Sequence, residues 1–303
     1  MILQSRTLVC IVAASLALSS AFIAVRASAR EVIPFAPVDG GLAQIQASID
    51  GAPSQPMLVD MGAGLDVISS REATKLHIAV TGSYTGWRLS GARVDTATGT
   101  VTSLSVGSLV VRDAVVGVWS GLDAAPIAGL ISATAFREQP VTFDFVHDEL
   151  ILEDPHSLEE RARSEPRVPL LLDDDRDISL GVFAKFNFAS KTGLCEVDTG
   201  SQGIFIDRRY AAELGVNLAA VPAKTIGSSG IIGQVVPIAS VALAGDRSAA
   251  IADPRVIFGN LIYDCSVGNE FWRNRSVTFD IPDRALYISA PYATVTNEYR
   301  FRL

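Results

Sequence analysis

Histidine, cysteine and basic charge are scarce in this chain of 303 residues. Three histidines and three cysteines are present, and 33 acidic residues outnumber 25 basic ones, which gives a formal net charge of −8. His77, His147 and His156 fall in no metal-ligand spacing, and no Gly-x-Ser-x-Gly sequence marks a serine nucleophile. We therefore expect no metal and no cofactor, and the acidic balance argues against a nucleic acid as partner.

Charge is also missing from a stretch near the N-terminus, residues 8–25. A basic start ending at Arg6 precedes this stretch, and the small residues Ala27-Ser28-Ala29 follow it. The pattern predicts a signal peptide over residues 1–29. The alternative is an uncleaved membrane anchor, because 18 uncharged residues approach the length of a membrane span. Both interpretations place the rest of the chain outside the cytoplasm, as a secreted, periplasmic or membrane-anchored protein.

Removal of this segment makes the chain more acidic and leaves two cysteines. Loss of its two arginines leaves 23 basic and 33 acidic residues, a net charge of −10. Cys195 and Cys265 remain, and neither lies in a sequence typical of a cysteine nucleophile. An exported chain can join them in a disulfide. Two small buried side chains on core strands are the alternative, and the sequence leaves both open.

One short motif occurs twice. Val59-Asp60-Met61-Gly62-Ala63-Gly64 lies in the first half, and Val197-Asp198-Thr199-Gly200-Ser201 in the second, each after an apolar run. The offset of 138 residues between Asp60 and Asp198 also relates Ser69 to Asp207. Such extended agreement indicates an internal duplication rather than a chance match.

Two later segments continue the repeat with small changes in offset. Val141-Thr142-Phe143-Asp144 corresponds to Val277-Thr278-Phe279-Asp280 at 136 residues. The segment Ile127-Ala128-Gly129 is matched to Ser266-Val267-Gly268 at 139 residues. Loop insertions explain such drifts, so we expect two units of the same fold.

Short runs rich in Val, Ile, Leu and Thr alternate with breaks at Gly, Asp and Ser, which predicts an all-β protein. One short helix is expected in each unit, over residues 70–76 and 207–215, because each begins at a capping residue. The polar stretch before Arg167 is typical of a linker. We therefore predict two β-barrel-like lobes over residues 31–155 and 166–292, a linker over 156–165 and a C-terminal tail over 293–303.

These motifs resemble those of the pepsin-like and retropepsin-like aspartic proteases, in the two-lobed, single-chain form that bacteria export. The signature is an apolar strand that runs into Asp-Thr/Ser-Gly-Ser/Thr/Ala, followed later by an apolar-apolar-Gly segment. Val197 to Ser201 match the signature fully, and Asp60, Gly62 and Ala63 match it in the first unit. The resemblance covers nearly the whole mature chain.

The resemblance implies an endopeptidase in which Asp60 and Asp198 share a proton and activate one water. Gly62, Ala63, Thr199, Gly200 and Ser201 would support the two loops. In the family, a Thr hydroxyl from each loop bonds to the opposite lobe; Thr199 can do this, whereas Met61 cannot. Activity without metal or covalent intermediate would act on a peptide or protein substrate, by a chain that we expect to be a monomer.

Two further features follow from the resemblance. A hairpin flap is expected between Tyr84 and Thr98, with Tyr84 and Trp87 as its candidate aromatic residues; a plain exposed turn is the alternative. Met61 also leaves a second function open. A catalytically weak or inactive member of this fold could act as a peptide-binding or inhibitory module.

Overall fold

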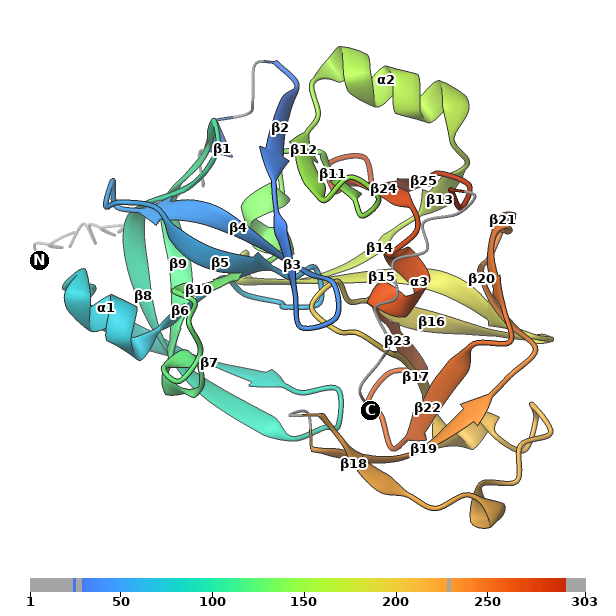
Figure 1. The fold of residues 1–303 in the computed structure, drawn as a ribbon. Coiled ribbons are helices and arrows are strands. Elements are labelled where there is room, and N and C mark those ends of the chain that lie inside the picture. Colours follow the sequence, from blue (N-terminus) through green and yellow to red (C-terminus); the bar gives the residue numbers. More distant parts are fainter. Residues whose placement is uncertain (1–23, 26–28, 228–229, 293–303) are drawn as a thin grey trace, which may run out of the picture.

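The computed structural model of the chain describes residues 24–25, 29–227 and 230–292, and most of these residues lie in β-strands. The strands form three sheets, of which two build separate lobes and the third joins them (Figure 1). This confirms the predicted all-β, two-lobed fold. Apart from β1 (Ala24–Val25) and Ala29, the predicted signal peptide lies outside the described residues, as does the predicted tail.

The first lobe is built on a nine-stranded sheet within the described residues, in the order β1-β9-β6-β10-β5-β4-β8-β7 with β3 beside β4. Alternate residues of β4 are buried, as the sequence pattern predicts. Besides β1, the sheet contains β3 (Ala36–Val38), β4 (Leu42–Ile49), β5 (Gln55–Val59), β6 (Val67–Ser69), β7 (Val80–Trp87), β8 (Arg93–Val106), β9 (Leu109–Trp119) and β10 (Gly129–Ile131).

The second lobe is built on a ten-stranded sheet, counted over the same described ranges, in the order β18-β19-β22-β17-β23-β16-β15-β20-β21 with β14 beside β15. Its strands are β14 (Leu171–Asp175), β15 (Ser179–Phe188), β16 (Lys191–Val197), β17 (Ile204–Asp207), β18 (Lys224–Ile226), β19 (Ile231–Pro237), β20 (Ser240–Leu243), β21 (Asp246–Ala252), β22 (Arg255–Gly259) and β23 (Cys265–Val267).

Four strands have the same arrangement in both lobes. In the first lobe β10 is parallel to β5 and antiparallel to β6, and β6 is parallel to β9. In the second lobe β23 is parallel to β16 and antiparallel to β17, and β17 is parallel to β22. The duplicated sequence therefore folds into two copies of one arrangement.

The strand pairings correct one register of the repeat. Ile131 pairs with Val59 where Val267 pairs with Val197, so Ser132, and not Gly129, corresponds to Gly268. The offset is therefore 136, as in the following segment, and the expected match of Ile127-Ala128-Gly129 at 139 is wrong. Gly268 is required because a Cβ there would lie 2.5 Å from two backbone carbonyl oxygens, whereas the first lobe accommodates a serine.

A six-stranded sheet joins the lobes in the order β13-β25-β24-β11-β12-β2. At its centre Thr142 pairs with Thr278, which is its own counterpart in the repeat, and the two hydroxyls are 2.6 Å apart. Phe143 and Phe279, also counterparts, meet edge to face at 5.7 Å. The lobes are thus related by an approximate twofold axis through this sheet. Its strands are β2 (Glu31–Pro34), β11 (Val141–Asp144), β12 (Glu149–Leu152), β13 (Arg167–Pro169), β24 (Ser276–Asp280) and β25 (Ala285–Ile288).

The helices differ in part from the prediction. Helix α1 (Ser70–Lys75) begins as expected, with the Ser69 hydroxyl accepting from the Glu72 N–H. Its counterpart is a 3₁₀ turn (Arg208–Tyr210) followed by turns, although Asp207 caps it, so the α-helix expected over 207–215 is wrong. The remaining short helices of the described residues are α3 (Asn269–Trp272) and the 3₁₀ segments Ser120–Leu122, Ala133–Phe136 and Leu218–Ala220.

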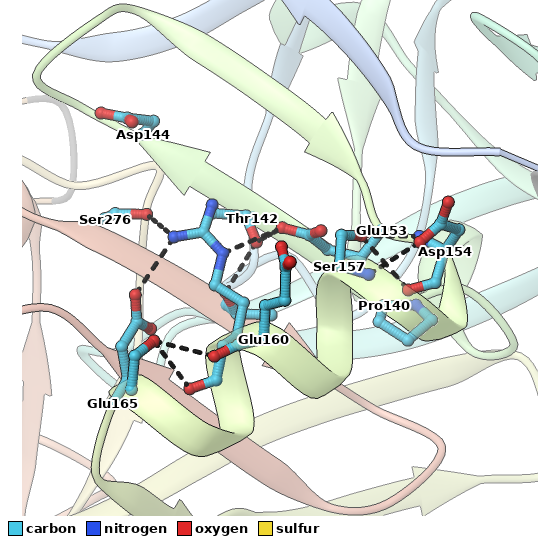
Figure 2. A network of polar contacts seen from close by, with 12 residues as sticks. Pro140, Thr142, Asp144, Glu153, Asp154, Ser157, Glu160, Glu165 and Ser276 are labelled. Atoms are coloured by element: carbon cyan, nitrogen blue, oxygen red, sulfur yellow. Dashed lines mark hydrogen bonds and ion pairs between the residues drawn. The ribbon is translucent and has the colours of Figure 1, made fainter.

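The stretch expected as a linker contains a helix, α2 (Pro155–Ser164), which lies along the joining sheet (Figure 1). Asp154 and Ser157 form a reciprocal capping box at its start. Arg161 fixes the helix to the sheet: its guanidinium donates to Glu153 at 3.2 Å, Glu165 at 3.1 Å and Ser276 at 2.9 Å (Figure 2). The Glu153 carboxylate also accepts from the Thr142 hydroxyl at 2.6 Å, so the network reaches the centre of the joining sheet.

Replacement of Arg161 by alanine should therefore destabilise the protein strongly. It leaves the fully buried Glu153 side chain without its cation, which typically costs about 3–5 kcal/mol of unfolding free energy. Arg163→Ala on the same helix removes only an exposed ion pair with Glu159 and should cost less than about 1 kcal/mol. Urea unfolding of both variants measures the difference. Equal small losses would contradict this role of Arg161.

Candidate active site

The two repeated aspartates lie at equivalent places, directly after β5 and β16. The Asp60 N–H donates to the Ile131 carbonyl at 2.8 Å, and the Asp198 N–H donates to the Val267 carbonyl at 3.1 Å. Each bond extends the parallel pairing of the preceding strand by one residue. Both aspartates are thereby fixed where the two lobes meet.

Glycine allows the two loops to approach each other closely. A Cβ on Gly62 would lie 2.7 Å from the Asp198 carboxyl carbon, and a Cβ on Gly200 would overlap the Asp60 carboxyl group. Each loop glycine thus leaves room for the aspartate of the opposite lobe, and a larger residue would push the carboxylates apart. The structure brings together the two aspartates that the sequence singled out.

The two carboxylates receive different hydrogen bonds. Asp60 Oδ1 accepts from the backbone N–H groups of Gly62 at 2.8 Å, Gly200 at 3.1 Å and Ala63 at 3.2 Å. Asp198 accepts from the Gly200 N–H at 3.0 Å and from the Ser266 hydroxyl at 3.2 Å. Because donors stabilise the ionised form, the carboxylate of Asp60 is the better stabilised of the two.

Burial and mutual repulsion make both acids hold their protons more tightly. Burial raises the pKa of Asp60, and its three backbone donors oppose that rise. Burial and the negative charge of Asp60 raise the pKa of Asp198 well above its ordinary 3.8. A hydrogen bond between the two side chains lowers the pKa of Asp60 and raises that of Asp198, as expected when Asp198 keeps the proton. The pair is arranged to share one proton, with Asp60 ionised.

Thr199 links the loops in one direction only. Its hydroxyl accepts from the Met61 N–H at 2.9 Å and donates to the Val59 carbonyl at 3.3 Å. Met61, at the equivalent position, is completely buried, but its thioether has no proton to donate in return. The interlobe link expected of Thr199 is therefore present, while Met61 fills the space by packing alone.

The remaining predicted support comes from the backbone and from a disulfide. The Ser201 carbonyl accepts from the Asn269 N–H at 2.8 Å, and the Asn269 side chain donates to the Thr199 carbonyl at 3.1 Å. Cys195 and Cys265 form a disulfide between β16 and β23. It lies three residues before Asp198, so it ties together the two strands that carry this loop.

A cleft of about 680 Å³ opens beside the pair, between the lobes. Gly62 and Ala63 line it from the first loop, and Tyr84 and Trp87 line it from the hairpin of β7 and β8. The hairpin spans the cleft: the Leu89 carbonyl at its tip accepts from the Ile262 N–H of the second lobe at 3.0 Å. In Figure 1 this hairpin extends from the first lobe towards β18. The structure thus places Tyr84 and Trp87 in a covering hairpin, although Trp87 remains 61% exposed.

Several residues near the site were not identified from the sequence. Ser266 and Leu89 act across long sequence separations that no local pattern reveals. Glu196 lines the cleft, and its signal was visible as an acid within an apolar strand. Asp66 is a buried carboxyl behind the first loop, where it accepts from the Ser132 N–H and from the Ser132 and Thr134 hydroxyls. Within the described residues, no cluster of His, Cys, Asp or Glu is placed to hold a metal ion, and no helix is both long and apolar enough to cross a bilayer.

Comparison with known proteins identifies the class to which this fold and site correspond. Residues 45–135 match the family model described as aspartyl protease. No curated protein matches the chain. The predicted relationship to the aspartic proteases is confirmed by this match together with the fold.

Solved structures with the same fold cover most of the chain at low identity. An aspartic proteinase from Irpex lacteus shares 14% identity over 88% of this chain and 99% of its own, with a TM-score of 0.54. Basic 7S globulin from soybean shares 12% over 87% of this chain and 95% of its own, with a TM-score of 0.53. The protein named edgp shares 11% over 88% of this chain and 96% of its own, with a TM-score of 0.55. At these identities the likeness shows a common two-lobed fold.

Thr199→Val tests the link between the loops. The change keeps the side-chain shape but leaves the buried Met61 N–H without its acceptor, so we expect a loss of about 1–3 kcal/mol in unfolding free energy. Ser201→Ala in the same loop, where the backbone makes the observed bonds, should cost less than about 0.5 kcal/mol. Urea unfolding measures both. A loss from Thr199→Val no larger than from Ser201→Ala would contradict the link.

Asp66→Asn tests how burial affects stability against pH. Burial raises the pKa of Asp66 from 3.8 to about 6. The folded chain therefore binds this proton more tightly than the unfolded chain, so the contribution to stability is complete below pH 3.8 and is lost as the pH rises through about 6. The variant should reduce the stability gained between about pH 7 and about pH 4 by up to about 3 kcal/mol. Asp113→Asn, on an exposed turn, is the control, and an unchanged pH dependence in Asp66→Asn would contradict the assignment.

Proposed function

We propose that the protein is an aspartic endopeptidase that hydrolyses internal peptide bonds with a water activated by Asp60 and Asp198. The observation that carries this proposal is the unequal stabilisation of two adjacent carboxyls. Asp60 accepts three backbone N–H groups, whereas Asp198 accepts one N–H and one hydroxyl. An ionised and a protonated carboxyl side by side supply a general base and a general acid at once.

The roles of the two acids follow from this difference. Asp60 takes a proton from a water in the cleft as that water attacks the carbonyl carbon of the scissile peptide bond. Asp198 gives its proton to the carbonyl oxygen, so a tetrahedral diol forms without a covalent bond to the protein. Collapse of the diol breaks the carbon–nitrogen bond, with a proton passing to the leaving amine from the pair. The pair then returns to its singly protonated state.

The cleft fits an extended peptide as substrate. It runs between the lobes, and the covering hairpin brings Tyr84 and Trp87 over it, so closure on a bound chain would exclude water from the acids. Opening at the tip requires only the separation of Leu89 from Ile262 and its apolar neighbours. We propose further that the chain is exported and acts as a monomer, supported for export by its N-terminal sequence and its disulfide.

Met61 supports a second candidate function, a peptide-binding or inhibitory module that has lost turnover. The first loop lacks the hydroxyl that Thr199 provides in the second. Small displacements of catalytic groups reduce rates strongly, whereas peptide binding along a cleft tolerates them better. Binding of peptides without any cleavage would favour this candidate.

Incubation with an unfolded protein across about pH 3 to pH 7 tests the proposal. We expect Asp60→Asn and Asp198→Asn each to lower kcat/KM at least about 100-fold, because each removes one partner of the proton transfer. Activity should fall at high pH as the shared proton is lost and at low pH as Asp60 protonates. The raised pKa of Asp198 places the high-pH limb well above 3.8.

Asp113→Asn, outside the cleft, should keep the activity of the parent protein. Product peptides would be identified by mass spectrometry. Equal cleavage by the parent and by either dyad variant would contradict the role of that aspartate.

A further inference from the structure

One carboxyl beside the dyad has no part in the proposed mechanism. Glu196 lies on β16 two residues before Asp198, so both side chains project from the same side of the chain. Its neighbours across the sheet are Phe183 on β15 and Ser266 on β23, and the Ser266 hydroxyl reaches Asp198. Glu196 lines the cleft. It therefore adjoins the reacting groups.

The internal duplication shows that the fold does not need an acid at this position. The offset of 138 that relates the two aspartates places Leu58 opposite Glu196. Leu58 occupies the same place on β5, with the same parallel partner strand, and its side chain is apolar. An apolar residue thus satisfies the architecture in one lobe, and the other lobe has a carboxyl where burial makes it costly.

No cation compensates this carboxyl. Among the described residues, none forms an ion pair or hydrogen bond with Glu196. Burial and the negative charges of Asp198 and Asp60 raise its pKa well above the ordinary 4.5. Other acids that line the cleft are neutralised from outside it: Asp174 by Arg137, and Asp175 by Arg176.

The surroundings of Glu196 accept a cation more readily than another acid. Asp173 and the Tyr263 hydroxyl face the same region, and the charges of Glu196 and Asp173 together with burial raise the pKa of Tyr263 to about 12. Tyr263 packs edge to face on Phe183 at 4.9 Å, which gives the region an aromatic wall. Arg88 is the basic residue among the described cleft-lining positions, and it stacks on Trp119 at 5.5 Å.

We propose that Glu196 is a specificity-determining residue that binds a cationic side chain, lysine or arginine, of the substrate residue next to the scissile bond. This inference rests on the proposed peptidase function. The ammonium or guanidinium group compensates the carboxylate that the empty cleft leaves alone, so binding favours ionisation of Glu196. Asp60, Asp198 and Asp173 add attraction for the same cation, while the Tyr263 hydroxyl remains neutral and can donate to Glu196.

A set of peptides that differ at one residue tests the proposal. One lysine, or its uncharged isostere norleucine, is placed at successive positions around the bond that the protein cleaves. For the position nearest Glu196, we expect kcat/KM to favour lysine over norleucine by at least about tenfold. Glu196→Gln should reduce this preference to about twofold or less and leave cleavage of the norleucine peptide within about threefold of the parent.

Glu270→Gln is the matched control, because Glu270 is a half-buried acid of the second lobe that does not line the cleft. It should keep the lysine preference. Cleavage without preference for a cation, or a preference that survives in Glu196→Gln, would overturn the inference and leave the peptidase function intact.

Binding separates the inference from the proposed function if no peptide is cleaved. Fluorescence anisotropy then compares the same labelled lysine and norleucine peptides on the parent and on Glu196→Gln. Tighter binding of lysine peptides by the parent alone supports the subsite even though the peptidase function fails. Equal binding of both peptides by the parent contradicts the subsite.

Discussion

The close approach of two loops from opposite lobes is the constraint on which this structure depends. Gly62 and Gly200 each leave the space that the aspartate of the other loop occupies, and the Thr199 hydroxyl bonds across the gap. A carboxyl pair in this arrangement cannot carry two negative charges at low cost. Proton sharing is therefore a consequence of backbone packing, and the same packing selects glycine in both copies of the motif.

The lobes are held in position by contacts far from the pair. Thr142 meets its own counterpart Thr278 at the centre of the joining sheet, and Arg161 attaches helix α2 to that sheet. Within the second lobe, the Cys195–Cys265 disulfide ties the strands that carry Asp198. The approximate twofold symmetry places the aspartates opposite each other. Departures from the symmetry then distinguish them: Ser266 corresponds to Leu130, Thr199 to Met61, and Glu196 to Leu58.

The sequence predicted those features that local patterns encode. Repeated motifs identified Asp60 and Asp198, alternating burial identified strands such as β4, and the Ser69 cap identified α1. Contacts between distant segments were out of reach, because the partners of Asp198 and Thr199 depend on how the lobes pack. The glycine of Ile127-Ala128-Gly129 gave a wrong register, since a glycine can be required by a neighbouring strand as well as by a repeat. Local capping at Asp207 likewise predicted a helix that the turns after Tyr210 do not continue.

The central claim is that Asp60 and Asp198 titrate as one coupled pair. Carbon-13 NMR of labelled aspartate, followed through a pH titration of the parent protein and of Asp60→Asn, measures this directly. The account predicts two linked transitions in the parent, with the upper pKa well above 3.8 and assigned mainly to Asp198. It also predicts that the pKa of Asp198 falls when Asp60 is neutral, because the repulsion is gone. Two independent transitions near 3.8, unchanged for Asp198 in the variant, would contradict it.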